Sequence, residues 1–250
     1  GGGMRTVRLP REKVSSGPLV LVNRQHPLRT SSAGTLSTVD GRHPNILLDR
    51  QAARLLAACI QKVGGGNEIV PVSGWRSQAE QQQIWEDTLA ESGPAFTRKY
   101  VAYPGCSEHQ TGLAIDLGKA AGHIDFIRPV FPDDGICGAF RKAAADYGFI
   151  ERYQRGKESL TGIAQEPWHF RYVGVPHARL MRQNNLCLEE YTDFLREKPR
   201  SCLLLDGRLA QVFYVPCTGA ETEIQLPDGC CQISGDNGEG FIVTAWGCPT

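Results

Sequence analysis

The spacing of apolar residues along the middle of the chain predicts helices and strands in alternation. A helical spacing, with apolar residues every three or four positions, occurs at about residues 49–63 and again over residues 137–147. Glycines directly after both segments are typical of helix ends. A third helix is predicted over about residues 78–91, because Ser77 and Glu80 have the spacing of a capping box that opens a helix.

Three shorter segments have the features of β-strands, namely residues 69–73, 113–117 and 168–173. In the second segment the apolar side chains alternate with Ala114 and Asp116, so Asp116 faces away from the apolar side. We therefore predict an α+β fold in which a small antiparallel sheet is flanked by helices.

Beyond about residue 186 the pattern changes to closely spaced strands. A helix there precedes two apolar runs joined through Asp206-Gly207, which is a strong hairpin signal. Further short strands are separated by turns rich in Pro, Asp and Gly. We therefore divide the chain into a main domain at residues 4–185 and a small β-rich C-terminal appendage at residues 186–250.

Two segments lack a regular apolar spacing. Residues 11–48 contain scattered Pro, Gly, Ser and Thr, and we expect them to wrap the core rather than to build it. Residues 118–135 contain Gly, Pro and two consecutive Asp residues, and read as an inserted loop beside Asp116. This position makes the loop a candidate lid over a site that includes Asp116.

The composition excludes some classes of function. With 41% hydrophobic residues, the 250-residue chain has enough apolar side chains for a sizeable core. Lysine plus arginine equals aspartate plus glutamate, at 27 each, so no net charge attracts nucleic acid or an anionic membrane. The three glycines before Met4 have the character of an expression scar. No apolar run after Met4 is long enough for a signal peptide or a membrane anchor, so we expect a cytoplasmic protein without membrane insertion if Met4 is the native start.

Two short motifs contain the candidate chemistry. The first is SEHQTGLAID at residues 107–116, and the second is EPWH at residues 166–169. A catalytic zinc ion takes three protein ligands from His, Asp or Glu and leaves a fourth position for water. The two motifs supply such a set in His109, Asp116 and His169.

The local sequence agrees with a shared site. Gly112 allows the chain to bend between His109 and the strand that follows, so that both histidine and aspartate can reach one ion. Pro167 argues against a helix with Glu166 and His169 on one face, so we expect Glu166 in a loop that leads into the strand. Each residue alone has an ordinary explanation as a turn, surface or core residue, and only their joint occurrence points to a metal site.

In these motifs the chain resembles the D-alanyl-D-alanine peptidases of the vancomycin-resistance group, VanX, VanY and VanXY. Their shared pattern is Ser-x-His-x-x-Gly-x-Ala-x-Asp followed by Glu-x-x-His, and this chain matches it throughout. The resemblance extends from about Val70 to Val173 and includes a Ser-Gly-aromatic-Arg-Ser turn at residues 73–77. Both motifs look most like the VanY and VanXY branches.

The resemblance implies one zinc ion and a role for each of six residues. The zinc ligands would be His109, Asp116 and His169. The general base would be Glu166, the transition-state-stabilising cation would be Arg76, and Ser107 would help to hold the terminal carboxylate of the substrate. Elementary chemistry supports the base and the cation, because hydrolysis moves a proton and builds negative charge on the scissile carbonyl.

The nine cysteines suggest two alternative sites. Their odd number, without a signal peptide, indicates reduced thiols. Cys106 with His109 would make a thiol peptidase, but a metal site needs no such nucleophile. A second, structural zinc site would use four C-terminal cysteines, although they contain no Cys-x-x-Cys pair: Cys217, Cys230, Cys231 and Cys248.

We therefore expect a zinc D,D-peptidase that removes the terminal D-Ala from peptidoglycan precursors, with the free dipeptide D-Ala-D-Ala as a further candidate substrate. One alternative is a cell-wall endopeptidase of the same superfamily that cuts between L-Ala and D-Glu. Another is a non-catalytic zinc module that binds peptides, although binding alone requires neither Glu166 nor Arg76. The sequence carries no signal for an oligomeric state.

Overall fold

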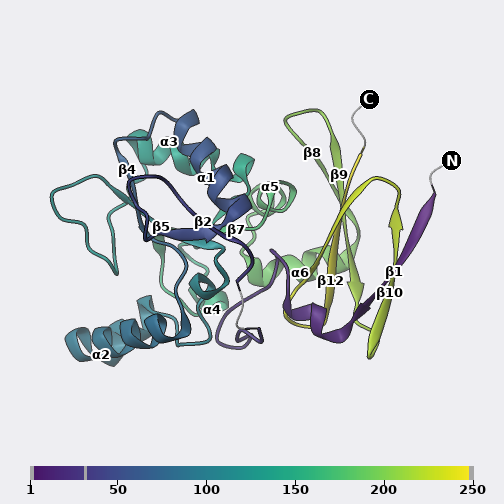
Figure 1. The fold of residues 1–250 in the computed structure, drawn as a ribbon, viewed down its shortest axis with the longest axis horizontal. Helices are drawn as coiled ribbons and strands as arrows, with labels where there is room; N and C mark the ends of the chain where they lie inside the picture. The colour runs from purple at the N-terminus through teal and green to yellow at the C-terminus, as the bar shows by residue number, and fades with distance from the viewer. Residues whose placement is uncertain (1–2, 31–32, 248–250) are drawn as a thin grey trace. The chain divides into compact units, whose positions relative to one another are not determined.

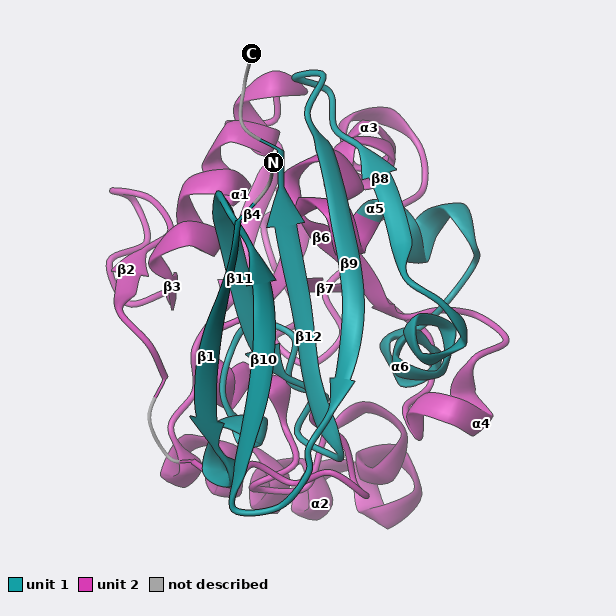
Figure 2. Ribbon diagram, turned by 90° about the vertical axis from the view of Figure 1, so that its right-hand side faces the viewer, with its two compact units in different colours: residues 1–21, 179–250 teal, residues 22–178 magenta. Residues whose placement is uncertain are grey.

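The computed structural model describes residues 3–30 and 33–247, and the chain divides into two compact units (Figures 1 and 2). One unit is residues 22–178, and the other joins residues 1–21 to residues 179–250. The division from the sequence had grouped the N-terminal segment with the motifs, whereas the structure groups it with the C-terminal strands.

The first unit is built on a four-stranded antiparallel sheet with the strand order β4-β5-β7-β6. Its strands are β4 (Ile69–Ser73), β5 (Ala114–Lys119), β6 (Phe149–Tyr153) and β7 (Glu166–Tyr172). A small hairpin of β2 (Leu36–Thr38) and β3 (Leu47–Asp49) precedes the sheet in sequence. The predicted α+β fold with a small antiparallel sheet is confirmed.

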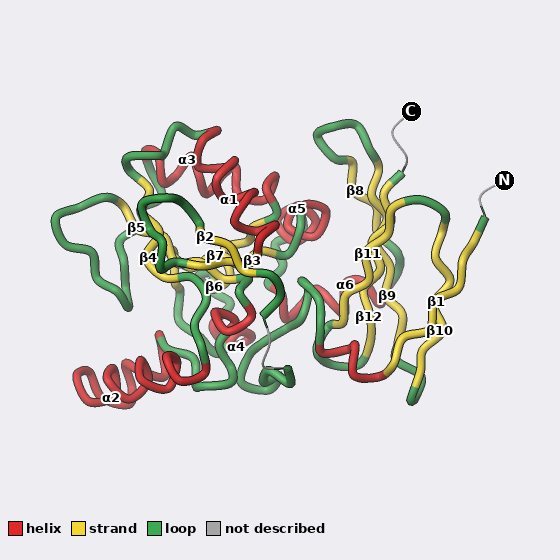
Figure 3. The backbone as a smooth tube through the Cα atoms, in the orientation of Figure 1, coloured by secondary structure: helices red, strands yellow, loops and turns green. Residues whose placement is uncertain are grey.

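Helices cover both sides of this sheet (Figures 1 and 3). Helices α1 (Arg50–Lys62) and α3 (Gly135–Ala143) lie on one side, and α2 (Gln78–Tyr100) lies on the other. The shorter helical elements are η2 (Glu108–Thr111), η3 (Ala144–Tyr147), α4 (Glu158–Thr161) and α5 (Val175–Gln183). Within the described part of the chain, no helix is both long enough and apolar enough to cross a membrane.

Helix α2 begins where the sequence predicts and continues beyond the predicted end. The Ser77 hydroxyl accepts a hydrogen bond from the backbone N–H of Glu80 at 3.1 Å, as expected for a helix N-cap. Gly93 interrupts the helix with φ of 81°, just after the predicted end, and a second helical stretch then runs to Tyr100. Proline is tolerated at position 94 because it opens this second stretch.

The two faces of the sheet differ in polarity. Ile115, Leu117 and Phe170 are fully buried in a core that α1 and α3 complete. Asp116 and His169 lie on the opposite face, directly across from each other in the antiparallel register. The alternation along β5 therefore separates the core from the polar face that carries the motifs.

The second unit is β-rich, as expected for the C-terminal part. Four of its strands form a sheet with the order β11-β12-β9-β8, and the strand β1 (Met4–Pro10) pairs antiparallel with β10 over its whole length. The remaining elements are η1 (Arg11–Ser15), α6 (Leu188–Glu197), β8 (Arg200–Leu203), β9 (Leu209–Pro216), β10 (Glu221–Pro227), β11 (Cys230–Gly235) and β12 (Gly240–Trp246). The sequence did not predict β1.

Candidate active site

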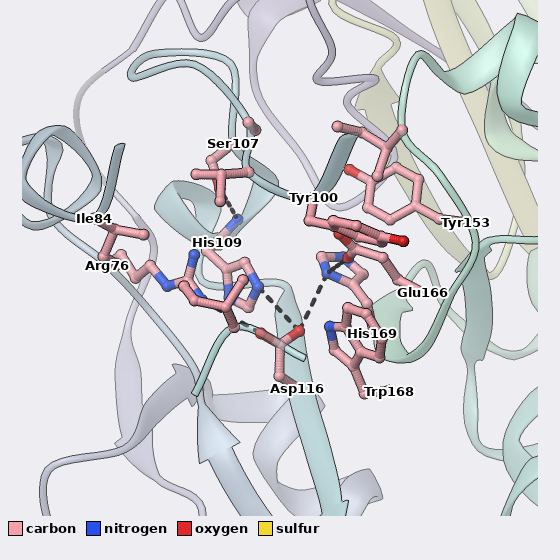
Figure 4. A pocket seen from close by; sticks show the side chains of 14 residues that line it. Arg76, Ile84, Tyr100, Ser107, His109, Asp116, Tyr153, Glu166, Trp168 and His169 are labelled. Carbon is pink, nitrogen blue, oxygen red and sulfur yellow. Dashed lines mark hydrogen bonds and ion pairs between the residues drawn. The ribbon is translucent and has the colours of Figure 1, made fainter. Parts of the chain in front are cut away.

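Three side chains from neighbouring elements converge on the polar face of the sheet (Figure 4). Asp116 comes from β5, His169 from β7, and His109 from η2, just before β5. Gly112 has φ of 79°, a left-handed conformation that lets the chain turn from η2 into the strand. One ligand atom of each side chain lies within 4.8 Å of the others, and all three residues are buried. The structure thus brings together the three ligands chosen from the sequence.

Hydrogen bonds determine which nitrogen of each imidazole faces Asp116. His109 Nδ1 lies 2.8 Å from the Gly74 carbonyl oxygen, which can only accept, so Nδ1 carries the proton. His169 Nε2 lies 2.7 Å from Glu108 Oε1 and donates to it. The other two ring nitrogens, each 3.2 Å from Asp116 Oδ1, carry lone pairs when the rings are neutral. Three acceptors that face one another attract a cation, and two imidazoles with one carboxylate are a set that suits zinc.

Glu108 supports His169 from behind. It is fully buried, and its Oε2 accepts hydrogen bonds from Arg152 Nε and Arg171 Nη1, both at 3.0 Å. Burial acts to raise the pKa of Glu108, but the two guanidinium groups and His169 hold it well below its usual range. The carboxylate is therefore ionised, and it fixes the orientation of the His169 ring and increases the basicity of its Nδ1.

The two histidines of this group have pKa values that are shifted in opposite directions. Burial and the charge of Arg76 lower the pKa of His109, which keeps this ring neutral. Burial also acts to lower the pKa of His169, but hydrogen bonds to Asp116 and Glu108 raise it to about 9. The His169 Nδ1 position thus binds a proton tightly when no metal ion is present, which means that a proton and a metal ion compete for it.

Glu166 is the first residue of β7, rather than part of the expected entry loop. It pairs with Tyr153 of β6, and the register of β6 and β7 shifts next to this pair, which lets the sheet accommodate Pro167. Its Oε2 lies 3.5 Å from His169 Nδ1. Burial raises the pKa of Glu166 well above its usual value, against the opposing charge of His169. A carboxyl group with a raised pKa is suited to proton transfer near neutral pH.

Arg76 lies at the corner between β4 and α2, where several contacts fix its guanidinium group. Nε donates to Ser73 Oγ at 2.9 Å, Nη1 to Gln81 Oε1 at 3.2 Å and Nη2 to Asp116 Oδ2 at 3.3 Å. The Arg76 backbone N–H donates to the His109 carbonyl oxygen at 3.1 Å, which joins the corner to η2. A buried, immobilised positive charge therefore lies directly beside the candidate metal site.

The site opens into a small cavity of about 30 Å³ (Figure 4). Its lining includes the three ligands together with Arg76, Glu166 and Ser107, so all six residues chosen from the sequence meet there. Ser107 is buried, and its hydroxyl accepts a hydrogen bond from the His109 backbone N–H at 3.3 Å. Ile127, from the loop after β5, also lines the cavity, which supports the description of this loop as a wall of the site.

Both the sequence and the fold are similar to those of known peptidases. Residues 45–175 match the VanY family, D-alanyl-D-alanine carboxypeptidase. The chain belongs to this family. The bifunctional D-Ala-D-Ala dipeptidase and D-Ala-D-Ala carboxypeptidase VanXYC of Enterococcus gallinarum is 40% identical over 184 residues, which are 73% of this chain and 97% of VanXYC.

Two solved structures extend the similarity to three dimensions. The vancomycin-resistance D,D-dipeptidase VanXYg, in complex with a D-Ala-D-Ala phosphinate analogue, is 49% identical with a TM-score of 0.95, covering 98% of this chain and 100% of VanXYg. A mutant of the vancomycin-resistance D,D-pentapeptidase VanY from the VanB-type cassette, in complex with Zn(II), is 30% identical with a TM-score of 0.60. That match covers 70% of this chain and 98% of VanY. The chain is accordingly a D,D-peptidase of the VanY family.

Sequence analysis missed the residues that hold the VanY-family site in place. Glu108, Arg152 and Arg171 are buried behind His169, and Gln81 is buried beside Arg76. Only Arg171 had a usable signal, because it follows His169 by two residues and therefore lies on the same face of β7. Glu108 occupies a variable position of the motif, so nothing marked it.

The structure also bears on the cysteine alternatives. Burial raises the pKa of Cys106, against the charge of Arg24, and Cys106 does not line the catalytic cavity. Both observations argue against a thiolate nucleophile. Cys217, Cys230 and Cys231 form no metal-binding group within the described residues, and Cys248 lies outside them.

Proposed function

We propose that the chain is a zinc-dependent D,D-peptidase that removes the terminal D-Ala from peptidoglycan precursors and also hydrolyses D-Ala-D-Ala. The observation that carries this proposal is the convergence of two imidazoles and a carboxylate in one cavity with Glu166 and Arg76. The substrate is supported by VanXYC, named for both activities, and by VanXYg, solved with a D-Ala-D-Ala phosphinate analogue. Zinc is supported by the ligand set and by the related VanY, solved in complex with Zn(II).

The residues of the site divide the chemistry among them. A zinc ion held by His109, Asp116 and His169 would act as a Lewis acid and lower the pKa of the attacking water. Glu166 accepts a proton from the attacking water while the water oxygen attacks the scissile carbonyl carbon. When the C–N bond breaks, Glu166 returns the proton to the leaving amino group of the terminal D-Ala.

Arg76 and Ser107 act on the charges of the substrate. Negative charge develops on the scissile carbonyl oxygen in the transition state, and the fixed guanidinium of Arg76 stabilises it without reorganising. Ser107 is proposed to hold the terminal carboxylate, because its hydroxyl lines the cavity beside the ligands. A module that only binds peptide needs neither a buried base nor a buried cation at the metal, so these residues favour catalysis.

The test is to identify the bond that the enzyme cleaves. Zinc-loaded protein is incubated separately with D-Ala-D-Ala, with a pentapeptide precursor and with an L-Ala-D-Glu peptide, and the products are identified by mass spectrometry. We expect free D-Ala from the first two substrates and no cleavage of the third. Cleavage of only the L-Ala-D-Glu bond would support the endopeptidase instead, and no cleavage of any substrate would support the binding module.

A matched variant separates the base from the ligands. Glu166→Ala should retain one zinc per chain and lose about 10²–10⁴-fold in kcat, because only the proton transfer is removed. His169→Ala should lose tightly bound zinc as well as activity, since two ligands cannot close the site. Near-wild-type turnover by Glu166→Ala would place the base elsewhere.

A further inference from the structure

A second cavity adjoins the catalytic one within the same unit. Its volume is about 140 Å³, compared with about 30 Å³ for the catalytic cavity. The two cavities share four lining residues, Val101, Ala102, Tyr153 and Ile163. A peptide of four or five residues cannot fit into the catalytic cavity alone, so a long substrate needs adjoining space, and the second cavity offers it.

The lining of the second cavity favours an anionic group attached to an apolar chain. Its described lining contains two arginines, Arg24 and Arg98, and no aspartate or glutamate. Trp85 and Tyr103 also line it, and their rings pack edge to face with centroids 5.2 Å apart. Guanidinium groups recognise carboxylates through paired hydrogen bonds, while the aromatic side chains provide surface for the aliphatic part of a peptide.

Ordered backbone holds both arginines at the cavity. Arg24 lies in a tight turn in which Asn23 Oδ1 accepts hydrogen bonds from the N–H groups of Gln25 and His26, at 3.0 and 2.9 Å. Just after this turn, the Leu28 N–H donates to the Gly105 carbonyl oxygen at 2.8 Å, which ties the segment to the loop before the first motif.

Arg98 lies in the second helical stretch of α2, close to its C-terminal end. The neighbouring Thr97 is fully buried and donates from Oγ1 to the Gly93 carbonyl oxygen at 2.8 Å. Both arginines are thus carried by ordered backbone, so ligand binding has to order only their two exposed side chains.

We propose that the second cavity binds the carboxylate-bearing part of the stem peptide on the amino side of the scissile bond, with Arg24 and Arg98 as the carboxylate ligands. The inference rests on the proposed function, because the catalytic cavity sets the position of the scissile bond. The D-Glu residue of a stem peptide provides such a carboxylate, whereas D-Ala-D-Ala has a single D-Ala on that side and no carboxylate there. Arg24 and Arg98 therefore select for the long substrate and leave dipeptide hydrolysis unchanged.

Binding of a reaction product tests the proposal without catalysis. The probes are the tetrapeptide L-Ala-γ-D-Glu-L-Lys-D-Ala and the same peptide with the D-Glu carboxylate converted to an amide, and the dissociation constants are measured by calorimetry with the zinc-loaded protein. We expect the carboxylate peptide to bind about tenfold more tightly than the amide. Arg98→Gln and Arg24→Gln should each remove most of this preference.

The matched control variant is Lys99→Gln, which removes the same charge one residue away at an exposed position that does not line the cavity. It should keep the wild-type preference for the carboxylate peptide. Equal affinity of the wild type for both peptides, or a preference that survives in both arginine variants, overturns the proposal. The proposal is also overturned if Lys99→Gln loses as much of the preference for the carboxylate peptide as the arginine variants do. That result would indicate a long-range effect of charge rather than a binding site.

Kinetics distinguish this proposal from the proposed function. For Arg98→Gln, kcat/KM should fall about tenfold for the carboxylate pentapeptide through KM, and should stay unchanged for D-Ala-D-Ala. If the wild type releases no D-Ala from any substrate while tetrapeptide binding still depends on the carboxylate and the arginines, the proposed function is wrong and the binding site stands. If D-Ala is released from all substrates and the variants change no ratio, only the inference about the second cavity is wrong.

Discussion

At His169, a proton and the proposed zinc ion compete for the same ring nitrogen. Its Nε2 donates to the ionised Glu108, so only Nδ1 is available for a metal ion. Hydrogen bonds to the two carboxylates overcome the effect of burial and raise the pKa of His169 to about 9, so at neutral pH the metal-free protein carries a proton on Nδ1. A zinc ion bound at Nδ1, as proposed above, would have to displace this proton.

Zinc affinity should therefore depend on pH. Below about pH 9 His169 is protonated in the metal-free state, so each unit of decrease in pH should weaken zinc binding at least about tenfold, and the dependence should flatten above pH 9. Competition with a chelator of known affinity, from about pH 6 to pH 10, measures this dependence. Glu166→Gln is the control, because it cannot titrate at position 166 and should keep the dependence. A zinc affinity that is independent of pH would show that His169 Nδ1 is not a ligand.

Glu108 should be needed for zinc affinity although it does not touch the metal. In Glu108→Gln the negative charge between His169, Arg152 and Arg171 is lost, which breaks an ion pair to each of two buried guanidinium groups. We expect zinc affinity to fall about 10–100-fold and the free energy of unfolding to fall by roughly 3–5 kcal/mol. Metal competition and chemical denaturation measure the two effects.

The exposed residue Glu158 offers a control for this prediction, since Glu158→Gln removes a charge of the same sign outside the site. It should leave both quantities unchanged. If Glu108→Gln is too unstable to purify, Glu108→Asp keeps the charge and should fold, with a smaller loss of zinc affinity from the shorter side chain. A folded Glu108→Gln with wild-type affinity would contradict the proposed support of His169.

At the scale of elements, local patterns were sufficient to predict where two of the candidate site residues lie. The alternation along β5 and the N-cap of α2 are local signals, so the sequence placed Asp116 on the polar face and Arg76 at a strand-to-helix corner. The buried support of the site was not readable in the same way. Gln81, near the start of α2, accepts a hydrogen bond from Arg76 and donates one to the Ala102 carbonyl oxygen beyond the end of the helix. In the sequence it is one of three consecutive glutamines. Such contacts depend on tertiary packing, and the spacing of apolar and polar residues along the chain does not reveal them.

The loop between β5 and α3 should select substrates by size. Ile127 lines the catalytic cavity, and the centroid of the Phe126 ring lies 5.4 Å from the Arg76 guanidinium carbon. Replacing residues 122–128 with two glycines should remove this wall of the cavity. The loss should weaken binding of a dipeptide more than binding of a pentapeptide, because the additional residues of the pentapeptide make contacts elsewhere. We expect the ratio of pentapeptide to dipeptide kcat/KM to rise about tenfold, with one zinc per chain retained.

Val130→Ser is the matched control for the loop, because Val130 is 70% exposed and does not line the catalytic cavity. It should leave the ratio at its wild-type value. An unchanged ratio of pentapeptide to dipeptide kcat/KM in the shortened variant would show that the loop does not select substrates by size. Other walls of the cavity would then have to select them.

At the scale of the whole molecule, the limit of sequence analysis was pairing between distant segments. Met4 pairs with Pro227 and Pro10 with Glu221, which closes a loop of more than two hundred residues. No local pattern specifies such a pairing, because a short strand carries the same alternation whichever strand it joins. Val7 and Leu9 pack against a small core that includes Ile224, Leu226 and Phe241, so the N-terminal strand contributes to the core of the second unit.

The strand β1 should therefore stabilise the second unit without being needed for the metal site. Val7→Ser removes apolar contacts with that core and should lower the free energy of unfolding by roughly 1–2 kcal/mol. Thr6→Ser is the matched control on the other face of the same strand, where the hydroxyl can still donate to Gln225. The three proposed metal ligands lie within residues 22–178, so zinc per folded chain should stay at one in both variants. Denaturant unfolding with zinc analysis checks both expectations, and an unchanged stability of Val7→Ser would show that β1 pairs with β10 without supporting the core.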